Sequence, residues 1–170
     1  NFTDNVASLD GGAILIAGNN NGVSYNGKIT DCNFINNSGK YGGAIYAGYN
    51  TNGLLNVTGS TFINNTATSE GGAIFTRFDI IVNNSTFINN TATSEGGAIR
   101  EYVANKYINV INSTFESNAA NNGGAVYSPG NVNITNSAFN DNNANINGGA
   151  VYSNGDVNVK DSNFTDNTAT

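Results

Sequence analysis

The chain has 170 residues, a formal net charge of −6 at pH 7 and only 11% charged residues, with Asn (36) and Gly (21) the commonest types. The excess of acidic residues argues against nucleic acid as a partner, because phosphate binding needs clustered Lys and Arg. No apolar run approaches the roughly 18 residues of a membrane-spanning helix, so we expect no membrane insertion by this segment. The 38% hydrophobic content, arranged in a regular pattern, argues against disorder.

Two short elements recur from one end of the chain to the other. A Phe-x-x-Asn element begins at Phe2, Phe34, Phe62, Phe87, Phe115, Phe139 and Phe164. A Gly-Gly-Ala-Ile/Val element begins at Gly11, Gly42, Gly71, Gly96, Gly123 and Gly148. The segment STFINNTATSEGGAI even occurs twice without change, at residues 60–74 and 85–99. A repeat of roughly 20 to 50 residues indicates a solenoid, a propeller or an array of small units.

The composition of the repeat selects among these architectures. Helical repeats are excluded, because no apolar residues recur at i, i+3 and i+4 and the chain is rich in Asn, Gly and Thr. Propeller blades need more residues, and leucine-rich repeats need a Leu frame that is absent. The sequence therefore predicts an all-β fold, a right-handed three-sided parallel β-helix of about six coils. Residues 1–170 begin and end inside a repeat, so we expect one β-helix segment of a longer repeat protein.

The last coil, residues 148–170, illustrates where strands and turns are expected within one repeat. Strands are expected at 148–152, 157–159 and 162–164, joined by turns, with 165–170 forming the turn to the next coil. Side chains alternate across a strand, so the aliphatic residue after Gly-Gly-Ala and the Phe of Phe-x-x-Asn point inward. The residue after that aliphatic position points outward, since it is Arg in one copy. This outward column comprises Leu15, Tyr46, Phe75, Arg100, Tyr127 and Tyr152.

Small polar residues are expected to support this core. The Asn of Phe-x-x-Asn falls at a corner in all seven copies, and we expect its side chains to form an amide ladder. Two residues before the Phe stands an inward Ser, replaced once by Cys32, which we expect to be a buried structural thiol. It is the single Cys, so no disulfide forms within this segment.

The alternation of GGAI and FxxN elements resembles the repeats of the chlamydial polymorphic membrane proteins, which are surface-displayed β-helical adhesins. The Asn/Thr-rich filling, as in NNSTFINNTATSEGGAI, is also similar to adhesin-like surface proteins of methanogens. The resemblance covers essentially the whole chain. It implies an extracellular or cell-surface location and attachment to a glycan or protein on a host or neighbouring cell.

Little in the sequence indicates catalysis. His, the commonest general base, is absent, and the twelve acidic residues are scattered. Asp141 and Asp166 occupy equivalent positions in successive coils, where we expect solvated turn residues, with a weak calcium site as the alternative. Glu70 and Glu95 also stack, as a consequence of the duplication. We expect no enzyme, no cofactor and no metal, with a polysaccharide lyase or hydrolase as the remaining alternative.

Aromatic residues provide the binding hypothesis. Longer coils carry extra residues after the Gly-Gly strand, at 17–28, 47–53 and 101–107, and these insertions are rich in Tyr. Aromatic and Arg side chains on a rigid scaffold favour recognition. The candidate binding residues are Tyr46, Tyr49, Phe75, Arg100, Tyr102, Tyr107, Tyr127 and Tyr152. The alternative is a structural spacer in a cell envelope or fibre, with lateral self-association left open.

Ten Asn-x-Ser/Thr sequons occur in the chain, many of them expected by chance in a sequence this rich in Asn and Thr. Asn56 and Asn133 are the candidate glycosylation sites, because the middle strand should present both of them outward.

Overall fold

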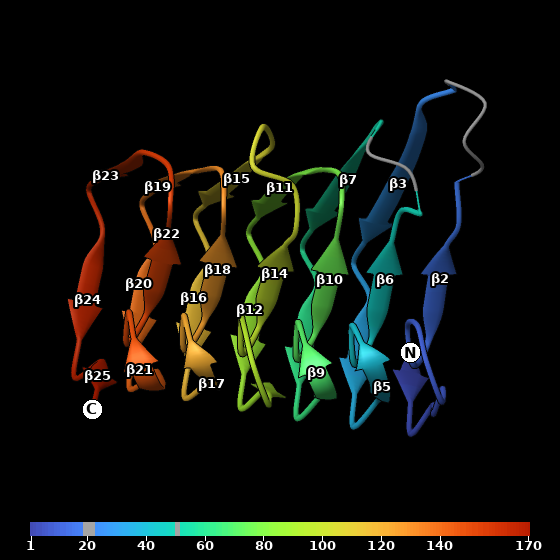
Figure 1. Ribbon diagram of the computed structural model, residues 1–170, viewed down its shortest axis with the longest axis horizontal. Coiled ribbons are helices and arrows are strands. Elements are labelled where there is room, and N and C mark those ends of the chain that lie inside the picture. Colours follow the sequence, from blue (N-terminus) through green and yellow to red (C-terminus); the bar gives the residue numbers. More distant parts are fainter. Residues whose placement is uncertain (19–22, 50–51) are drawn as a thin grey trace.

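The computed structural model describes residues 1–18, 23–49 and 52–170, and within these ranges the regular structure consists of β-strands without a helix (Figure 1). Successive coils lie side by side along the long axis, from the N-terminal coil to the C-terminal coil. Every strand pairs in parallel with its counterparts in the neighbouring coils. No helix that could span a membrane is found among the described residues.

Each coil contributes one strand to each of four sheets. The Phe sheet contains β1 (Phe2–Thr3), β4 (Asn33–Ile35), β8 (Thr61–Ile63), β12 (Thr86–Ile88), β16 (Thr114–Glu116), β20 (Ala138–Asn140) and β24 (Asn163–Thr165). The Gly-Gly sheet contains β2 (Ile14–Ile16), β6 (Ile45–Ala47), β10 (Ile74–Thr76), β14 (Ile99–Glu101), β18 (Val126–Ser128) and β22 (Val151–Ser153).

The other two sheets complete the coil. The middle sheet contains β3 (Tyr25–Thr30), β7 (Gly53–Thr58), β11 (Asp79–Asn83), β15 (Tyr107–Ile111), β19 (Asn131–Thr135) and β23 (Val157–Lys160). A short sheet contains β5 (Ser38–Tyr41), β9 (Thr66–Glu70), β13 (Thr91–Ala92), β17 (Ala119–Asn122), β21 (Asn143–Asn147) and β25 (Thr168–Ala169). The parallel β-solenoid of about six coils is thus confirmed. The segment expected to be only a turn between coils forms the additional short sheet.

The core is a set of side-chain columns that run along the solenoid. Ring centroids of successive Phe residues in the Phe sheet lie 4.6 to 4.8 Å apart. This spacing matches the distance between neighbouring strands, so identical side chains stack directly. The aliphatic column of the Gly-Gly sheet is fully buried in the inner coils, as at Ile74 and Ile99, and half-buried at Ile14 and Val151 in the end coils. Both inward columns are therefore as predicted.

Three positions with positive φ angles recur from coil to coil and turn the backbone at its corners. In one coil these are Gly71 (φ 67°), Asn84 (φ 48°) and Asn89 (φ 53°). Gly, Asn and Asp tolerate this left-handed conformation better than other residues do. Asp141 and Asp166 occupy the third of these corner positions, with φ values of 54° and 53°. Six Asn and eight Gly residues of the described chain have a positive φ, so part of its unusual Asn and Gly content serves to turn the backbone.

The Asn of Phe-x-x-Asn forms the predicted ladder inside the next corner. Asn90 Nδ2 donates to Asn118 Oδ1 at 3.0 Å and to Phe62 O at 3.0 Å. Its Oδ1 accepts from Asn65 N at 3.0 Å and from Asn65 Nδ2 at 2.9 Å. Both polar groups of this buried amide are paired, as burial demands. The same pattern links each pair of neighbouring coils from Asn5 to Asn167.

A second ladder, which the sequence analysis did not predict, joins the small residues before each Phe. Ser85 N donates to Ser113 Oγ at 3.1 Å, and Ser85 Oγ donates to Asn83 O at 2.9 Å. Cys32 occupies the corresponding position in its coil, and its N donates to Ser60 Oγ at 3.1 Å. The thiol is half-buried and not buried as expected, with Sγ donating to Thr30 O at 3.2 Å.

Candidate binding site

The outward column of the Gly-Gly sheet forms two aromatic stacks. Tyr46 and Phe75 stack with centroids 5.1 Å apart, and Tyr127 and Tyr152 stack 4.9 Å apart. Arg100 lies between the two stacks, since it pairs in register with Phe75 on one side and Tyr127 on the other. Its guanidinium carbon lies 4.4 Å from the centre of the Tyr127 ring, a cation–π contact.

The middle of this column is covered by other side chains. It points away from the core as predicted, but Tyr46, Phe75 and Arg100 are only 5%, 3% and 6% exposed. These three candidate binding residues therefore face away from the core but are covered and not open to solvent. The cover comes from residues just after the strands, including Tyr49 beside Tyr46 (5.3 Å) and Tyr102 beside Phe75 (5.6 Å).

Arg100 owes its burial to a pair of carboxylates. Its Nε lies 2.7 Å from Glu95 Oε2 and 3.2 Å from Glu70 Oε2. A buried guanidinium needs such partners, because desolvation of an unpaired charge is costly. Glu70 and Glu95, which the sequence analysis assigned only to the duplication, thus neutralise Arg100. Burial raises the pKa of the Glu70 carboxyl, against the opposing effect of Arg100.

These carboxylates belong to a second column that sequence reasoning missed. The residue directly before each Gly-Gly pairs with its counterpart in the next coil, which gives a pre-glycine column of Asp10, Tyr41, Glu70, Glu95, Asn122 and Asn147. This column runs beside the outward column. A signal was present in the sequence, since the position before Gly-Gly is polar or Tyr in all six copies.

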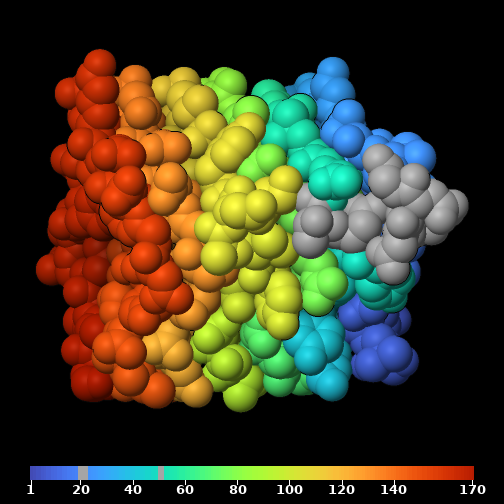
Figure 2. All heavy atoms as spheres, turned by 45° about the horizontal axis from the view of Figure 1, so that its top comes forward, coloured from blue at the N-terminus to red at the C-terminus, as the bar shows by residue number. Residues whose placement is uncertain are grey.

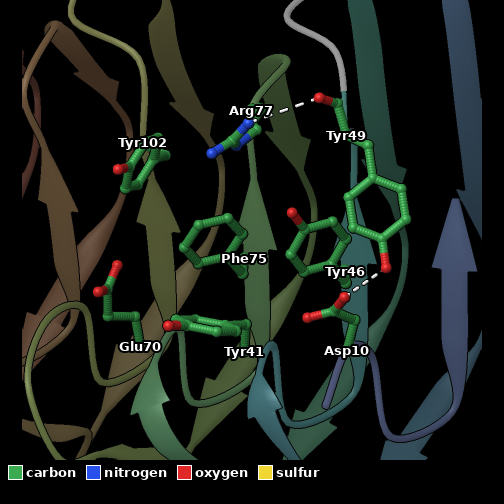
Figure 3. A pocket seen from close by; sticks show the side chains of 8 residues that line it. All are labelled: Asp10, Tyr41, Tyr46, Tyr49, Glu70, Phe75, Arg77 and Tyr102. Carbon is green, nitrogen blue, oxygen red and sulfur yellow. Dashed lines mark hydrogen bonds between the residues drawn. The ribbon is translucent and has the colours of Figure 1, made fainter. Parts of the chain in front are cut away.

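A pocket of about 380 Å³ lies where the two columns meet (Figure 3). It is lined by Asp10, Tyr41, Tyr46, Tyr49, Glu70, Phe75, Arg77 and Tyr102. Tyr46 and Phe75 come from the outward column, whereas Asp10, Tyr41 and Glu70 come from the pre-glycine column. Arg77, Tyr49 and Tyr102 follow the Gly-Gly strands. Figure 2 shows one face of the solenoid, on which the coils follow one another from the N-terminal end (blue) to the C-terminal end (red).

Hydrogen bonds and charge order the rim of the pocket. The Tyr49 hydroxyl donates to Asp10 Oδ2, and this hydrogen bond raises the pKa of Tyr49. Burial raises the pKa of Tyr46 to about 12, so its hydroxyl stays protonated at neutral pH. The Arg77 guanidinium carbon lies 4.7 Å from the centre of the Tyr102 ring, and Nη1 donates to Tyr49 O at 3.5 Å.

The structure brings together half of the predicted binding residues. Tyr46, Tyr49, Phe75 and Tyr102 line the pocket, whereas Arg100, Tyr107, Tyr127 and Tyr152 do not. Asp10, Tyr41, Glu70 and Arg77 line it without having been predicted.

Two of the remaining predicted binding residues are held elsewhere. Tyr107 begins β15, where its N donates to Asp79 Oδ1 at 3.0 Å, and Arg100 is held by Glu70 and Glu95. The insertions at 17–28 and 47–53 lie partly outside the described residues.

The two candidate glycosylation sites lie on the middle sheet. Asn56 in β7 and Asn133 in β19 are half-buried and alternate with buried neighbours, so both point outward. Asn133 Nδ2 donates to Asn109 Oδ1 at 2.8 Å, and Asn133 Oδ1 accepts from Asn158 Nδ2 at 3.0 Å. The amide nitrogen that a glycan would modify is therefore already engaged at Asn133.

The described residues contain no group of three or more Cys, Asp or Glu side chains that could hold a metal ion. The pocket carboxylates Asp10 and Glu70 are each engaged by a neighbouring side chain, Tyr49 and Arg100 respectively. What the arrangement offers is a cup of aromatic faces with charged groups at its rim, which suits binding of a small polar ring.

The fold and its repeating corners define a β-solenoid repeat protein, and comparison with known families refines this class. The model of the Chlamydia polymorphic membrane protein repeat matches residues 31–48, 59–77, 84–100 and 112–129. Each match runs from the corner before a Phe strand to the end of a Gly-Gly strand. These four segments are therefore similar in sequence to the polymorphic membrane protein repeat. No curated protein and no solved structure matches the chain, and the resemblance to methanogen adhesin-like proteins stays a prediction.

Proposed function

We propose that this segment is an adhesin-like, extracellular part of a surface protein, which attaches to a glycan or protein on a host or neighbouring cell. The polymorphic membrane protein-type repeats support a cell-surface location. The single observation that carries the attachment role is the pocket formed by five aromatic rings, Asp10, Glu70 and Arg77. Four of its eight side chains stand on strands of the solenoid, namely Tyr41, Tyr46, Glu70 and Phe75, so ordering this part of the pocket on binding would cost little conformational entropy.

A purely structural spacer is the second candidate. The continuous Phe, Asn and Ser columns favour it, because they stabilise every coil without any ligand. The coils that carry Tyr127 and Tyr152 share these columns but contribute nothing to the pocket. A spacer would therefore need only the ladders, and lateral packing between chains would be its main interaction.

Binding to an immobilised glycan array and to cell extracts separates the two functions. The wild-type segment is compared with the double substitution Tyr49→Ser and Tyr102→Ser, which removes two exposed rings from the rim. Attachment predicts binding that the double substitution abolishes. Tyr152→Ser, on the same outward column but outside the pocket, is the matched control. Absence of binding by the wild-type segment would support the spacer. Equal binding by the wild type and the double variant would contradict attachment through the pocket.

The pocket also bears on the enzymatic alternative. Glycosidases use two carboxylates with separate tasks, and Asp10 and Glu70 are the acidic side chains among the described residues that line the pocket. Because the Asp10 carboxylate accepts from Tyr49 and Glu70 pairs with Arg100, the arrangement favours holding a ligand over hydrolysing it.

Glycosylation is part of the same proposal. Asn56 is the preferred acceptor, since modification of Asn133 would break its hydrogen bond to Asn109. Intact-mass measurement of the protein from its native source should show a glycan that Asn56→Gln removes and Asn133→Gln leaves in place. A mass without any added glycan would contradict glycosylation of this segment.

A further inference from the structure

The pocket is polarised across its aromatic wall. Phe75 and Tyr46 form a stacked pair at the back, and the Tyr41 ring contacts the edge of Phe75 at 5.4 Å. Figure 3 shows Arg77 at one end of these rings, with Asp10 and Glu70 at the opposite end. A ligand lying on the rings would meet a cation at one end and carboxylates at the other.

Arg77 has donors to spare. Its guanidinium carries five N–H groups, and among the described residues it contacts the Tyr49 carbonyl and the Tyr102 ring. Among the described residues, the ion pairs involve Arg100 and Lys106 but not Arg77. Arg77 Nε is shielded from solvent and makes no hydrogen bond within the described part of the chain. The positive charge of Arg77 is therefore free for an anionic ligand group, and it opposes entry of a cation into the aromatic cup.

The carboxylates of the pocket have a different role. Asp10 accepts one hydrogen bond from Tyr49, which leaves further lone pairs for a ligand hydroxyl. Glu70 is turned toward Arg100, with its Oε2 buried. Hydroxyl groups suit this end of the pocket, whereas a second acidic group there would be repelled by Asp10.

We propose that the pocket binds one acidic pyranose unit, with the sugar ring on Phe75 and Tyr46, its carboxylate against Arg77 and its hydroxyls toward Asp10. This inference rests on the proposed function and names its ligand class. Aromatic faces provide an apolar floor for the C–H face of a sugar. Arg matches the planar geometry of a carboxylate better than Lys does. The volume of about 380 Å³ lies near the lower end of the roughly 300–1,000 Å³ of ligand sites, which favours one unit over a long chain.

Ligand-observed NMR titration of the intact segment tests this inference. The probes are the methyl glycosides of glucuronic and galacturonic acid, each compared with its neutral counterpart, methyl glucoside or methyl galactoside. We expect at least one uronate to bind about tenfold more tightly than its neutral counterpart, since a charge-assisted hydrogen bond is stronger than a neutral one. Its saturation-transfer signals should be strongest on one face of the sugar ring, and added NaCl should weaken its binding.

Substitutions locate the binding. Arg77→Gln should reduce uronate binding to the level of the neutral sugar, and Arg77→Lys should keep part of the preference. Lys160→Gln, which removes an exposed positive charge outside the pocket, should change nothing. Thermal melting of each variant confirms that the fold is retained, and Tyr102→Ser gives an independent loss by removing a ring.

Three results would overturn the inference: equal binding of acidic and neutral sugars, a preference that survives Arg77→Gln, or no binding of either uronate. If cell attachment still depends on Tyr49 and Tyr102 while no sugar binds, the ligand is a protein. In that case the proposed function holds and the sugar inference fails. If the segment neither binds a sugar nor attaches to cells through Tyr49 and Tyr102, the spacer function is left.

Discussion

Asn65 donates from Nδ2 to Oδ1 of Asn90 in the next coil at 2.9 Å, and this bond joins two copies of one sequence. The duplicated segment at 60–74 and 85–99 thus stacks on itself, with Phe62 on Phe87 at 4.6 Å. In a solenoid each coil contacts only its neighbours, so a coil that packs against a copy of itself can be repeated.

Replacing Asn90 with Ala should destabilise the fold by about 3 kcal/mol or more, because two buried donors of Asn65 lose their acceptor. Urea denaturation measures the loss. Asn158→Ala is the control, since the Asn158 side chain is exposed and donates to Asn133, and it should cost less than about 0.5 kcal/mol. Similar losses for the two substitutions would contradict a structural role for the buried ladder.

Replacing Phe87 with Ala should cost roughly 3–5 kcal/mol, because the cavity would interrupt a fully buried column of stacked rings. Tyr152→Ala removes a ring of the outward column and should cost less than about 1.5 kcal/mol. The same denaturant titration compares them, and a larger loss for Tyr152→Ala would mean that inside and outside are assigned incorrectly.

Removal of Arg100 should leave Glu70 and Glu95 close together without their shared cation. Arg100→Met is expected to cost about 2 kcal/mol or more of folding stability. The carboxylates of Glu70 and Glu95 would remain desolvated and would repel each other without the cation that pairs with both. Adding Glu70→Gln and Glu95→Gln should recover most of this loss. Failure of the triple variant to recover stability would show that Arg100 acts through ring packing on Tyr127 and not through its charge.

Stability should fall as the pH rises through the titration of Glu101. This carboxyl is fully buried and bonded to Val103 N and Ser128 Oγ, and burial raises its pKa from 4.5 to about 7. The folded state therefore keeps the proton to higher pH than the unfolded chain does. The stabilisation is complete below about pH 4.5 and is lost as the pH approaches 7, amounting to roughly 3 kcal/mol at most.

Urea midpoints from pH 4 to 8 measure this slope, and Glu101→Gln should flatten most of it. Glu70 contributes in the same direction, because burial also raises its pKa. A wild-type slope of the opposite sign, or an unchanged slope in Glu101→Gln, would contradict this assignment.

The repeats predict those features that one coil determines by itself. The inward Phe and Ile columns, the outward column and the ladder of Asn at the corners all follow from side-chain alternation within a coil. The same logic predicts the parallel solenoid, because each coil then packs against its equivalent in the next.

Features that depend on two different columns could not be predicted in this way. Arg100 is buried only because two carboxylates of the neighbouring pre-glycine column pair with it. Glu70 belongs to the preceding coil, and Glu95 belongs to the same coil as Arg100. The pocket likewise combines Asp10, Tyr46 and Arg77 from three successive coils. Lateral distances between columns depend on how each corner bends, and the spacing of residues along the chain does not specify this bend.

Competition for attachment tests the central claim, recognition through the pocket, most directly. The soluble segment is added to cells that bind the parent protein, and residual attachment is measured as a function of segment concentration. The wild-type segment and its Tyr152→Ser variant should inhibit attachment equally. The double variant Tyr49→Ser and Tyr102→Ser should lose inhibition at least tenfold while melting at a similar temperature. Equal inhibition by the double variant and the wild type would contradict recognition at the pocket.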